Sequence, residues 1–384
     1  MRMLVLGGGL QGSACAWDLL RTTEADVTLA DAHQGALPAV LDPYRGNRLT
    51  VATLDARDHA GVRDRMAGHA AVMSALPYYL NADMARLAVE AGVHFADLGG
   101  NTDIVRQQQR LDAEARARRV SVMPDCGLAP GMVNILAAEG IRRLETVDAV
   151  RCYVGGLPQD PQPPLNYTIV YSLEGVLDYY TTAGWILRDG RPTRVEALSE
   201  LEFVEFPAPA GRLEAFHTAG GISTMPWDFE GRIPVMEYKT LRYPGHADIM
   251  RTIRELGLLS TDTVDVRGVA VRPRDLFVAL VDARLRRPQA RDLVALRVVV
   301  TGKRGGAPAT VTFSVLDRFD EQHGISAMMR TTGYSLSITG QLQLAGEIPA
   351  GVTTAYEGMP FGRYVAALAE RGIVIADETK PGAR

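Results

Sequence analysis

The feature that most constrains the fold is a glycine-rich hexapeptide close to the N-terminus. An apolar run at Met3–Leu6 leads into the sequence GGGLQG at residues 7–12, and a helical pattern extends from Gln11 to Arg21. A strand, a GxGxxG turn and a helix in this order are typical of the first βαβ unit of a Rossmann fold. Because the strand of such a unit pairs with parallel neighbours, we expect an α/β sheet in the N-terminal part of the chain.

Short apolar runs alternate with helical stretches up to about residue 125. Six runs are expected to be strands: Met3–Leu6, Val27–Ala30, Leu49–Ala52, Ala70–Ala75, Val93–Ala96 and Val120–Met123. Strands separated by helices form parallel sheets that are covered on both faces. The right-handed crossover rule then favours a doubly wound, Rossmann-type parallel sheet.

The pattern changes after Pro130, where β-rich sequence takes over. Two apolar runs, Leu293–Val300 and Thr310–Leu316, flank the glycines of Lys303–Gly306 and predict a β-hairpin. The other expected elements are helices at Gly131–Leu144, Ser326–Ala345 and Phe361–Arg371 and a short strand at Ile373–Ala376.

The expected fold class is α/β, with a second, mixed α/β and β-rich domain after the Rossmann sheet. A chain of 384 residues suggests two or three domains at ~150 residues each. We place a dinucleotide-binding domain at residues 1–130 and a domain for substrate binding and oligomerisation at residues 131–325. C-terminal helices at residues 326–384 are expected to return to the Rossmann domain.

The charge balance excludes several classes of partner. A net charge of −4 leaves no basic surplus to neutralise the phosphates of nucleic acids or anionic membranes. No apolar run approaches the ~20 residues that span a bilayer. The three cysteines are scattered and form no CxxC pair, and no residues have metal-ligand spacing. We therefore expect a cytoplasmic protein that binds no metal, nucleic acid or membrane.

The hexapeptide predicts a dinucleotide site. Gly7 permits the tight turn, Gly9 lets the backbone approach a pyrophosphate, and Gly12 allows the helix to pack closely on the strand. The helix N-terminus, at Leu10 and Gln11, supplies backbone amides and a partial positive charge for phosphate oxygens.

Asp31, at the end of the second expected strand, favours NAD over NADP. A carboxylate at this position can accept hydrogen bonds from both ribose hydroxyls and repels a 2′-phosphate. The next residues, Ala32 and His33, include no arginine that could hold such a phosphate. An aspartate that caps the following turn is compatible with either coenzyme.

Two further turns are expected to border the cofactor. Asp55 follows the third strand and is placed to meet the adenine edge, with a solvated loop residue as the alternative. The fourth strand is followed by Ala75, Leu76 and Pro77. Because a dinucleotide runs across the carboxyl ends of the strands, this turn should border the nicotinamide ribose.

Several segments together carry a resemblance to a known family. They are Ser74–Asn81, Phe95–Gly100, Pro124–Gly131, Gly155–Gln159, Glu214–Thr224, Tyr238–His246 and Met329–Tyr334. The first three resemble the saccharopine dehydrogenase superfamily. The next three, in the second domain, resemble its L-lysine 6-dehydrogenase branch, and the last fits the same superfamily.

The resemblance implies NAD-dependent oxidation of the ε-carbon of L-lysine. The products would be ammonia and 2-aminoadipate 6-semialdehyde, which cyclises to a piperideine carboxylate. A homo-oligomer, either a dimer or a dimer of dimers, is also implied. Two alternatives stay open: a saccharopine- or carboxynorspermidine-type enzyme that acts on a secondary amine, and a non-catalytic dinucleotide-binding protein.

Oxidation of an amine requires a group that takes up a proton, because the amine must be neutral when hydride leaves its carbon. Asp125 follows the sixth strand at the edge where substrate and nicotinamide should meet, so we predict a catalytic role for it. Asp97, which ends the fifth strand, is expected to bind substrate. Both have a structural alternative, which for Asp125 is capping the helix after Pro130.

The segment at residues 238–243 offers cations for a substrate carboxylate. Arg242 suits bidentate binding, with Tyr243 beside it, and a surface salt bridge is the alternative. Lys239 is one of three lysines among 41 basic residues, and we predict that it carries a proton or contacts a carboxylate. Strand alternation places Lys239 and Arg242 on opposite faces, unless the strand ends before Arg242.

Two more residues complete the candidate site. His246 lies at a helix start, where the helix dipole would keep it neutral as a catalytic base. The alternative is a buried histidine with satisfied hydrogen bonds. Thr218 lies in a turn of small residues that could contact the substrate or could be a plain tight turn.

Overall fold

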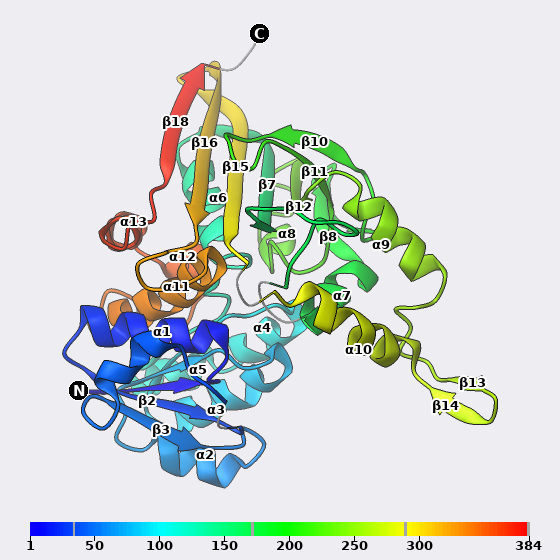
Figure 1. Ribbon diagram of the computed structural model, residues 1–384. Coiled ribbons are helices and arrows are strands. Elements are labelled where there is room, and N and C mark those ends of the chain that lie inside the picture. The colour runs from blue at the N-terminus through cyan, green and yellow to red at the C-terminus, as the bar shows by residue number, and fades with distance from the viewer. Residues whose placement is uncertain (34, 170–172, 288–289, 382–384) are drawn as a thin grey trace. The chain divides into compact units, whose positions relative to one another are not determined.

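The structure is a computed structural model that describes residues 1–33, 35–169, 173–287 and 290–381. The chain forms two compact units (Figure 1). Unit 1 comprises Met1–Leu144, Ile222–Met225 and Asp320–Ala376, and unit 2 comprises the other described residues, from Glu145 onward. Within the described ranges, no helix is both long enough and apolar enough to cross a membrane.

Unit 1 is built on a parallel sheet of seven strands. In chain order they are β1 (Arg2–Leu6), β2 (Asp26–Asp31), β3 (Leu49–Thr53), β4 (Ala71–Ser74), β5 (His94–Asp97), β6 (Ser121–Met123) and β17 (Gly351–Val352). They lie in the order β17-β6-β5-β4-β1-β2-β3, and each pairs in parallel with its neighbours. This topology confirms the predicted doubly wound sheet and its six strands, and β17 is an addition that the sequence did not indicate.

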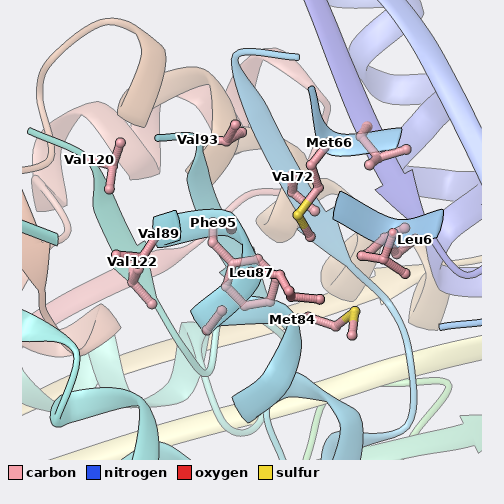
Figure 2. Close-up of a cluster of buried hydrophobic side chains, with 14 of the residues drawn as sticks. Leu6, Met66, Val72, Met84, Leu87, Val89, Val93, Phe95, Val120 and Val122 are labelled. Atoms are coloured by element: carbon pink, nitrogen blue, oxygen red, sulfur yellow. The ribbon is translucent and has the colours of Figure 1, made fainter. Parts of the chain in front are cut away.

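Helices cover both faces of this sheet. They are α1 (Leu10–Thr22), α2 (His59–Met66), α3 (Asn81–Ala91), α4 (Thr102–Gln109), α5 (Asp112–Arg118), α6 (Met132–Arg142), α11 (Ala327–Leu344), α12 (Ala355–Gly358) and α13 (Phe361–Glu370), with 3₁₀ turns η1 (Ala39–Tyr44) and η2 (Tyr78–Leu80). On one face, Leu6, Val72 and Phe95 pack with Met84 and Leu87 of α3 (Figure 2).

The opposite face of the sheet packs against α11. Gly340 of α11 lies against the side chains of Met3 and Met73. These two side chains lie on the opposite face of the sheet from those of the next residues, Leu4 and Val72. All four strand residues are buried. Burial on both faces explains why these strands read as continuous apolar runs in the sequence.

Unit 2 is built on a mixed sheet of nine strands. They are β7 (Thr146–Pro158), β8 (Gly184–Arg188), β9 (Arg191–Val195), β10 (Glu202–Glu205), β11 (Arg212–His217), β12 (Val235–Arg242), β15 (Asp292–Arg304), β16 (Ala307–Arg318) and β18 (Ala376–Pro381). The long strands β15 and β16 form the predicted hairpin, with β18 beside β16 (Figure 1).

Four helices and a separate hairpin complete unit 2. The helices are α7 (Leu173–Thr181), α8 (Met225–Asp228), α9 (His246–Glu255) and α10 (Pro273–Leu285), and the hairpin is β13 (Val264–Val266) with β14 (Val269–Val271). The first residue of α8, Met225, is grouped with unit 1. Apolar side chains of α7, α9 and α10 form one cluster with Tyr167 and Phe216. The small hairpin projects beyond α10 (Figure 1).

Several elements differ from the sequence predictions. The hairpin turn is formed by Gly305 and Gly306 alone, because Lys303 and Arg304 continue β15. The last strand begins at Ala376, where the predicted strand was expected to end. The units also divide the chain elsewhere than the predicted domains, since α6 and residues 320–325 belong to unit 1 and residues from Asp377 belong to unit 2.

Candidate active site

The glycine turn of unit 1 has the geometry of a dinucleotide loop. Gly7 has a φ of +96°, and its amide donates to the carbonyl oxygen of Ala30 at 2.8 Å. A Cβ on Gly12 would lie 1.8 Å from the carbonyl oxygen of Gly7, so only glycine permits this contact. A Cβ on Gly9 would meet no atom within 4 Å, which leaves room for a ligand at the turn.

The N-terminus of α1 is suited to bind a phosphate. Its N-cap is Gly9, no side chain caps it, and no acidic residue lies in its first turn. The side-chain amide of Gln11 is buried, and neither of its polar atoms has a hydrogen-bond partner among the described residues. Free amides, the helix dipole and this carboxamide fit the pyrophosphate of a dinucleotide.

Asp31 lies at the end of β2, beside the glycine turn. One carboxylate oxygen accepts from the Gly8 amide at 2.7 Å, and the other accepts from the His33 amide at 2.8 Å. Asp31 therefore caps the following turn, as the sequence alternative proposed, and also holds a negative charge next to the dinucleotide loop.

The other two predicted cofactor turns have different surroundings. Asp55 is solvent-exposed and pairs with Arg57 at 2.8 Å, which lowers the pKa of Asp55 to about 2 through hydrogen bonding. Ala75 donates its amide to Leu6 at 2.8 Å, and its carbonyl oxygen would lie 2.9 Å from a Cβ on Gly7. The turn of Ala75, Leu76 and Pro77 thus lies directly against the glycine turn, whereas Asp55 is committed to Arg57.

Asp97 is a buried carboxyl group at the carboxyl end of β5. One oxygen accepts from the Gly99 amide at 2.7 Å, and the other accepts from the side-chain amide of Gln108 at 2.6 Å. Asp97 is completely shielded from solvent. Burial raises its pKa to about 6, although the hydrogen bonds from Gln108, Gly99 and the Asp125 amide oppose the shift.

Asp125 lies beside Asp97, two residues beyond the end of β6. One carboxyl oxygen accepts from the Gly100 amide at 3.4 Å, and the other accepts from the hydroxyl of Ser223. Burial raises the pKa of Asp125 to about 7; Ser223 and Gly100 lower it, and the negative charge of Asp97 raises it. A carboxyl group with this pKa exchanges protons near neutral pH.

The strand register brings the carboxyl pair towards the cofactor loop. Leu6, which precedes the glycine turn, pairs with Ser74, and Ser74 pairs with Asp97. Asp97 is therefore two strand spacings, ~10 Å, from the strand that carries the glycine turn. Asp97 and Asp125 therefore lie buried at the same carboxyl edge of the sheet as the glycine turn.

Lys239 is buried in β12 of unit 2 and is paired internally. Its Nζ donates to the carboxylate of Glu202 and to the carbonyl oxygen of Glu200, both at 2.8 Å. β12 continues through Arg242, so the two cations lie on opposite faces of the strand, as strand alternation predicted. The alternative, in which the strand ends before Arg242, is wrong. Lys239 is the partner of Glu202 in this structure, and its catalytic role stays a prediction.

Arg242 and His246 belong to a buried hydrogen-bonded chain. Arg242 stacks over Tyr167, and its Nε donates to the Tyr180 hydroxyl at 3.0 Å. The ring of His246 contacts that hydroxyl through Nε2 and the carbonyl oxygen of Leu165 through Nδ1, both at 3.0 Å. Since a carbonyl only accepts, Nδ1 carries the proton and Nε2 accepts from Tyr180.

This arrangement bears on two predicted roles. Burial, assisted by the charge of Arg242, lowers the pKa of His246 to about 3. His246 is thus a neutral, buried histidine with both nitrogens hydrogen-bonded, as the alternative proposed, and the geometry speaks against a catalytic base. Arg242 is only 4% exposed, so the surface salt bridge is wrong for this residue.

Thr218 and Tyr243 are also engaged within unit 2. The hydroxyl of Thr218 is 2.8 Å from the hydroxyl of Thr240, and the hydroxyl of Tyr243 donates to the carbonyl oxygen of Pro158 at 2.9 Å. Both side chains are buried. Their predicted contacts with substrate stay predictions.

One cluster of unit 2 has side chains of the metal-binding type. Nε2 of His217 lies 3.2 Å from Glu200 and 3.9 Å from Glu237. Arg188 pairs with Glu200 at 2.7 Å, and Arg151 pairs with Glu237 at 3.0 Å. These arginines already balance the two carboxylates, so the cluster is an ion-pair network within unit 2.

Two residues that hydrogen-bond to the carboxyl pair, Gln108 and Ser223, were not predicted from the sequence. Gln108 lies on α4 with no local signal that it would face Asp97. Ser223 belongs to the Glu214–Thr224 segment that carried the family resemblance, but it is 98 residues from Asp125 in the chain. Only that resemblance could have drawn attention to Ser223.

The fold and the glycine turn define a dinucleotide-binding Rossmann protein with a β-rich second unit. Residues 3–123 match the saccharopine dehydrogenase NADP binding domain, and residues 127–373 match the saccharopine dehydrogenase C-terminal domain. The chain therefore belongs to the saccharopine dehydrogenase family, as its motifs predicted.

Curated relatives match part of their own length. A saccharopine dehydrogenase (NADP(+), L-glutamate-forming) from Pyricularia oryzae is 27% identical over 222 residues, which cover 56% of this chain and 48% of that protein. The enzyme of the same name from Schizosaccharomyces pombe is 23% identical over 269 residues, covering 67% and 58%. The chain thus spans about half the length of these relatives.

A solved structure shares the fold along the whole chain. The apo, histidine-tagged saccharopine dehydrogenase (L-Glu forming) from Saccharomyces cerevisiae superposes with a TM-score of 0.81. The two chains are 19% identical, and the match covers 99% of each. At this identity the similarity establishes the fold.

Proposed function

We propose that this protein is a nicotinamide-dependent amine dehydrogenase that oxidises the carbon bearing an amino group. The observation that carries the proposal is the buried pair Asp97 and Asp125, located in the same unit as the glycine turn and on the same edge of its sheet. Carboxyl groups in this position attract a cationic amine and can remove its proton.

The free energy of proton transfer from the amine depends on the pKa of Asp125. A free alkylamine has a pKa of ~10.4, and Asp125 has a pKa of about 7. Moving the proton from amine to Asp125 thus costs about 4–5 kcal/mol in water. Burial of the ammonium reduces this cost, because a desolvated amine holds its proton less tightly.

The reaction balances with one coenzyme and one water. The bound nicotinamide coenzyme supplies the acceptor for the hydride that leaves the amine-bearing carbon. The resulting iminium takes up water and releases ammonia, so the amine carbon becomes an aldehyde. In this sequence the negative charge of Asp97 attracts the substrate ammonium before Asp125 accepts its proton, and the amine is then neutral when hydride leaves.

NAD is the coenzyme that Asp31 favours. Its carboxylate is fixed beside the glycine turn by the amides of Gly8 and His33. A 2′-phosphate near this charge would be repelled. The names of the two curated relatives include NADP. We propose that this chain differs from them in its choice of coenzyme.

L-Lysine, oxidised at its ε-carbon, is the substrate that we propose. The support is the resemblance of Gly155–Gln159, Glu214–Thr224 and Tyr238–His246 to L-lysine 6-dehydrogenases. A secondary amine of the saccharopine type is the second candidate, because the curated relatives are named for that substrate.

A substrate screen with both coenzymes tests these proposals. Reduced-nicotinamide absorbance would be followed with L-lysine and with saccharopine, each with NAD or NADP, at alkaline pH. We expect turnover with L-lysine and NAD. Turnover with saccharopine alone would favour the second candidate, and coenzyme binding without turnover of any amine would favour a non-catalytic protein.

We further propose that the protein is a homo-oligomer that associates through α10 and the β13–β14 hairpin. Leu276 and Leu280 lie on one side of α10 and are 52% and 55% exposed. Val264, Val266 and Val269 share one face of the hairpin and are also exposed. Several exposed large apolar side chains on successive elements are typical of a protein interface.

The charges around this surface favour a second copy of the chain as the partner. Asp262, Asp265, Arg267 and Arg272 are exposed nearby, so two copies can place opposite charges against each other. Light scattering of Leu276→Glu combined with Leu280→Glu tests the proposal. We expect a lower molar mass than wild type, whereas Val374→Glu, at another exposed apolar position, should leave it unchanged.

A further inference from the structure

Two non-glycine residues with left-handed backbone conformations meet at the carboxyl site. Asp125 has a φ of +62°, Ser223 has a φ of +49°, and the Ser223 hydroxyl donates to the Asp125 carboxyl group. Residues other than glycine adopt this conformation at an energetic cost, and such residues are concentrated at functional sites. Here two of them are joined by one hydrogen bond.

We propose that Ser223 is a positioning residue that holds the Asp125 carboxyl group in its anionic, proton-accepting form. The proposal rests on the proposed function, because it assigns Asp125 the task of accepting a proton from the substrate. Ser223 acts through Asp125 and is not required to touch the substrate.

The segment around Ser223 is held firmly within unit 1. The hydroxyl of Thr224 is 2.7 Å from that of Tyr356, and the side-chain amide of Asn134 contacts the sulfur of Met225 at 3.3 Å. The side chains of Ser223, Thr224 and Met225 thus each contact a different part of unit 1. This anchoring fixes the direction from which the hydroxyl reaches Asp125.

The groups that face Asp125 act in opposite directions. The negative charge of Asp97 raises the pKa of Asp125. The nearby Cys126 thiol is buried, and burial together with the charges of Asp97 and Asp125 raises its own pKa. The Gly100 amide, at 3.4 Å, and the Ser223 hydroxyl favour the charge. Of these two donors, only the hydroxyl can be removed by a side-chain substitution.

Infrared titration of the buried carboxyl group tests the proposal without any substrate. The carbonyl band of protonated Asp125 would be assigned by difference from Asp125→Asn and followed with pH. Ser223→Gly removes the hydroxyl and suits the positive φ, so it should fold. We expect the midpoint to rise by roughly one pH unit, as loss of a hydrogen bond to a charged group implies.

Matched variants separate positioning from packing. Thr224→Val removes the neighbouring buried hydroxyl and should leave the midpoint of Asp125 in place, whereas Asp97→Asn should lower it. Ser223→Ala repeats the test with a Cβ present. An unchanged midpoint in both Ser223 variants, or an equal rise in Thr224→Val, would overturn the proposal. Failure of every amine to turn over would count against the proposed function alone.

Discussion

Replacement of Asp125 by asparagine separates the charge of this side chain from its shape. Asparagine is close in volume and tolerates the φ of +62° found at this position. The pKa of Asp125 is raised from 3.8 to about 7, chiefly by burial. About three pKa units correspond to about 4 kcal/mol of folding free energy.

The sign of the effect depends on pH. Because the folded-state pKa lies above the unfolded value, protonated Asp125 costs nothing below about pH 4, and its ionisation destabilises the wild type by about 4 kcal/mol as the pH rises to above 7. The uncharged asparagine side chain would avoid this loss but would give up a hydrogen bond worth about 1 kcal/mol. We therefore expect Asp125→Asn to be less stable by about 1 kcal/mol at acid pH and more stable by about 3 kcal/mol near pH 8.

Calorimetric unfolding from about pH 4 to about pH 9 measures this difference directly. Asp55→Asn is a useful control, since the pKa of Asp55 is lowered to about 2 by Arg57 and its contribution is lost as pH falls. Asp55→Asn should therefore show no gain at alkaline pH. If the stability of Asp125→Asn relative to wild type does not rise between acid and alkaline pH, the reasoning about the buried charge is wrong.

Three further substitutions test the cofactor loop and unit 2. Asp31→Ser should weaken NAD binding by at least about tenfold and leave NADP binding less affected, as measured by calorimetric titration with both coenzymes; equal losses would remove the coenzyme argument. A Cβ on Gly12 would lie 1.8 Å from the carbonyl oxygen of Gly7, so Gly12→Ala should abolish binding of either coenzyme in the same titration. Lys239→Arg keeps the charge but removes the lysine amine, so a proton-carrying Lys239 predicts a loss of kcat of about a hundredfold; a kcat within roughly threefold of wild type would instead assign Lys239 to its ion pair with Glu202 alone.

The strands of unit 1 were predictable because a strand that is buried on both faces is a continuous apolar run in the sequence. Met3 and Leu4 are both buried although they point to opposite faces, and this gives a continuous apolar run. β17 has only two residues, Gly351 and Val352, and so leaves no run. Its place beside β6 depends on the return of the chain after α11 and not on its own sequence.

The carboxyl site was predictable in part. Asp97 and Asp125 could be placed because the ends of adjacent parallel strands meet at one edge of the sheet. Their partners Gln108 and Ser223 could not, because no rule of spacing connects a helix side chain or a distant turn to that edge. The raised pKa of Asp125 follows from burial and from these partners, and therefore belongs to the folded structure.

The sequence by itself determined the dinucleotide loop and the position of Asp31. The glycines act through their own backbone conformation and Asp31 through its place at the end of β2, so both requirements are visible as a motif, although Asp31 contacts Gly8 across 23 residues. The tertiary structure alone decided that Lys239 pairs with Glu202. It also decided that both ring nitrogens of His246 are hydrogen-bonded, to the Tyr180 hydroxyl and the Leu165 carbonyl oxygen. The chemistry of such groups is set by burial and by partners distant in sequence, which a linear pattern does not record.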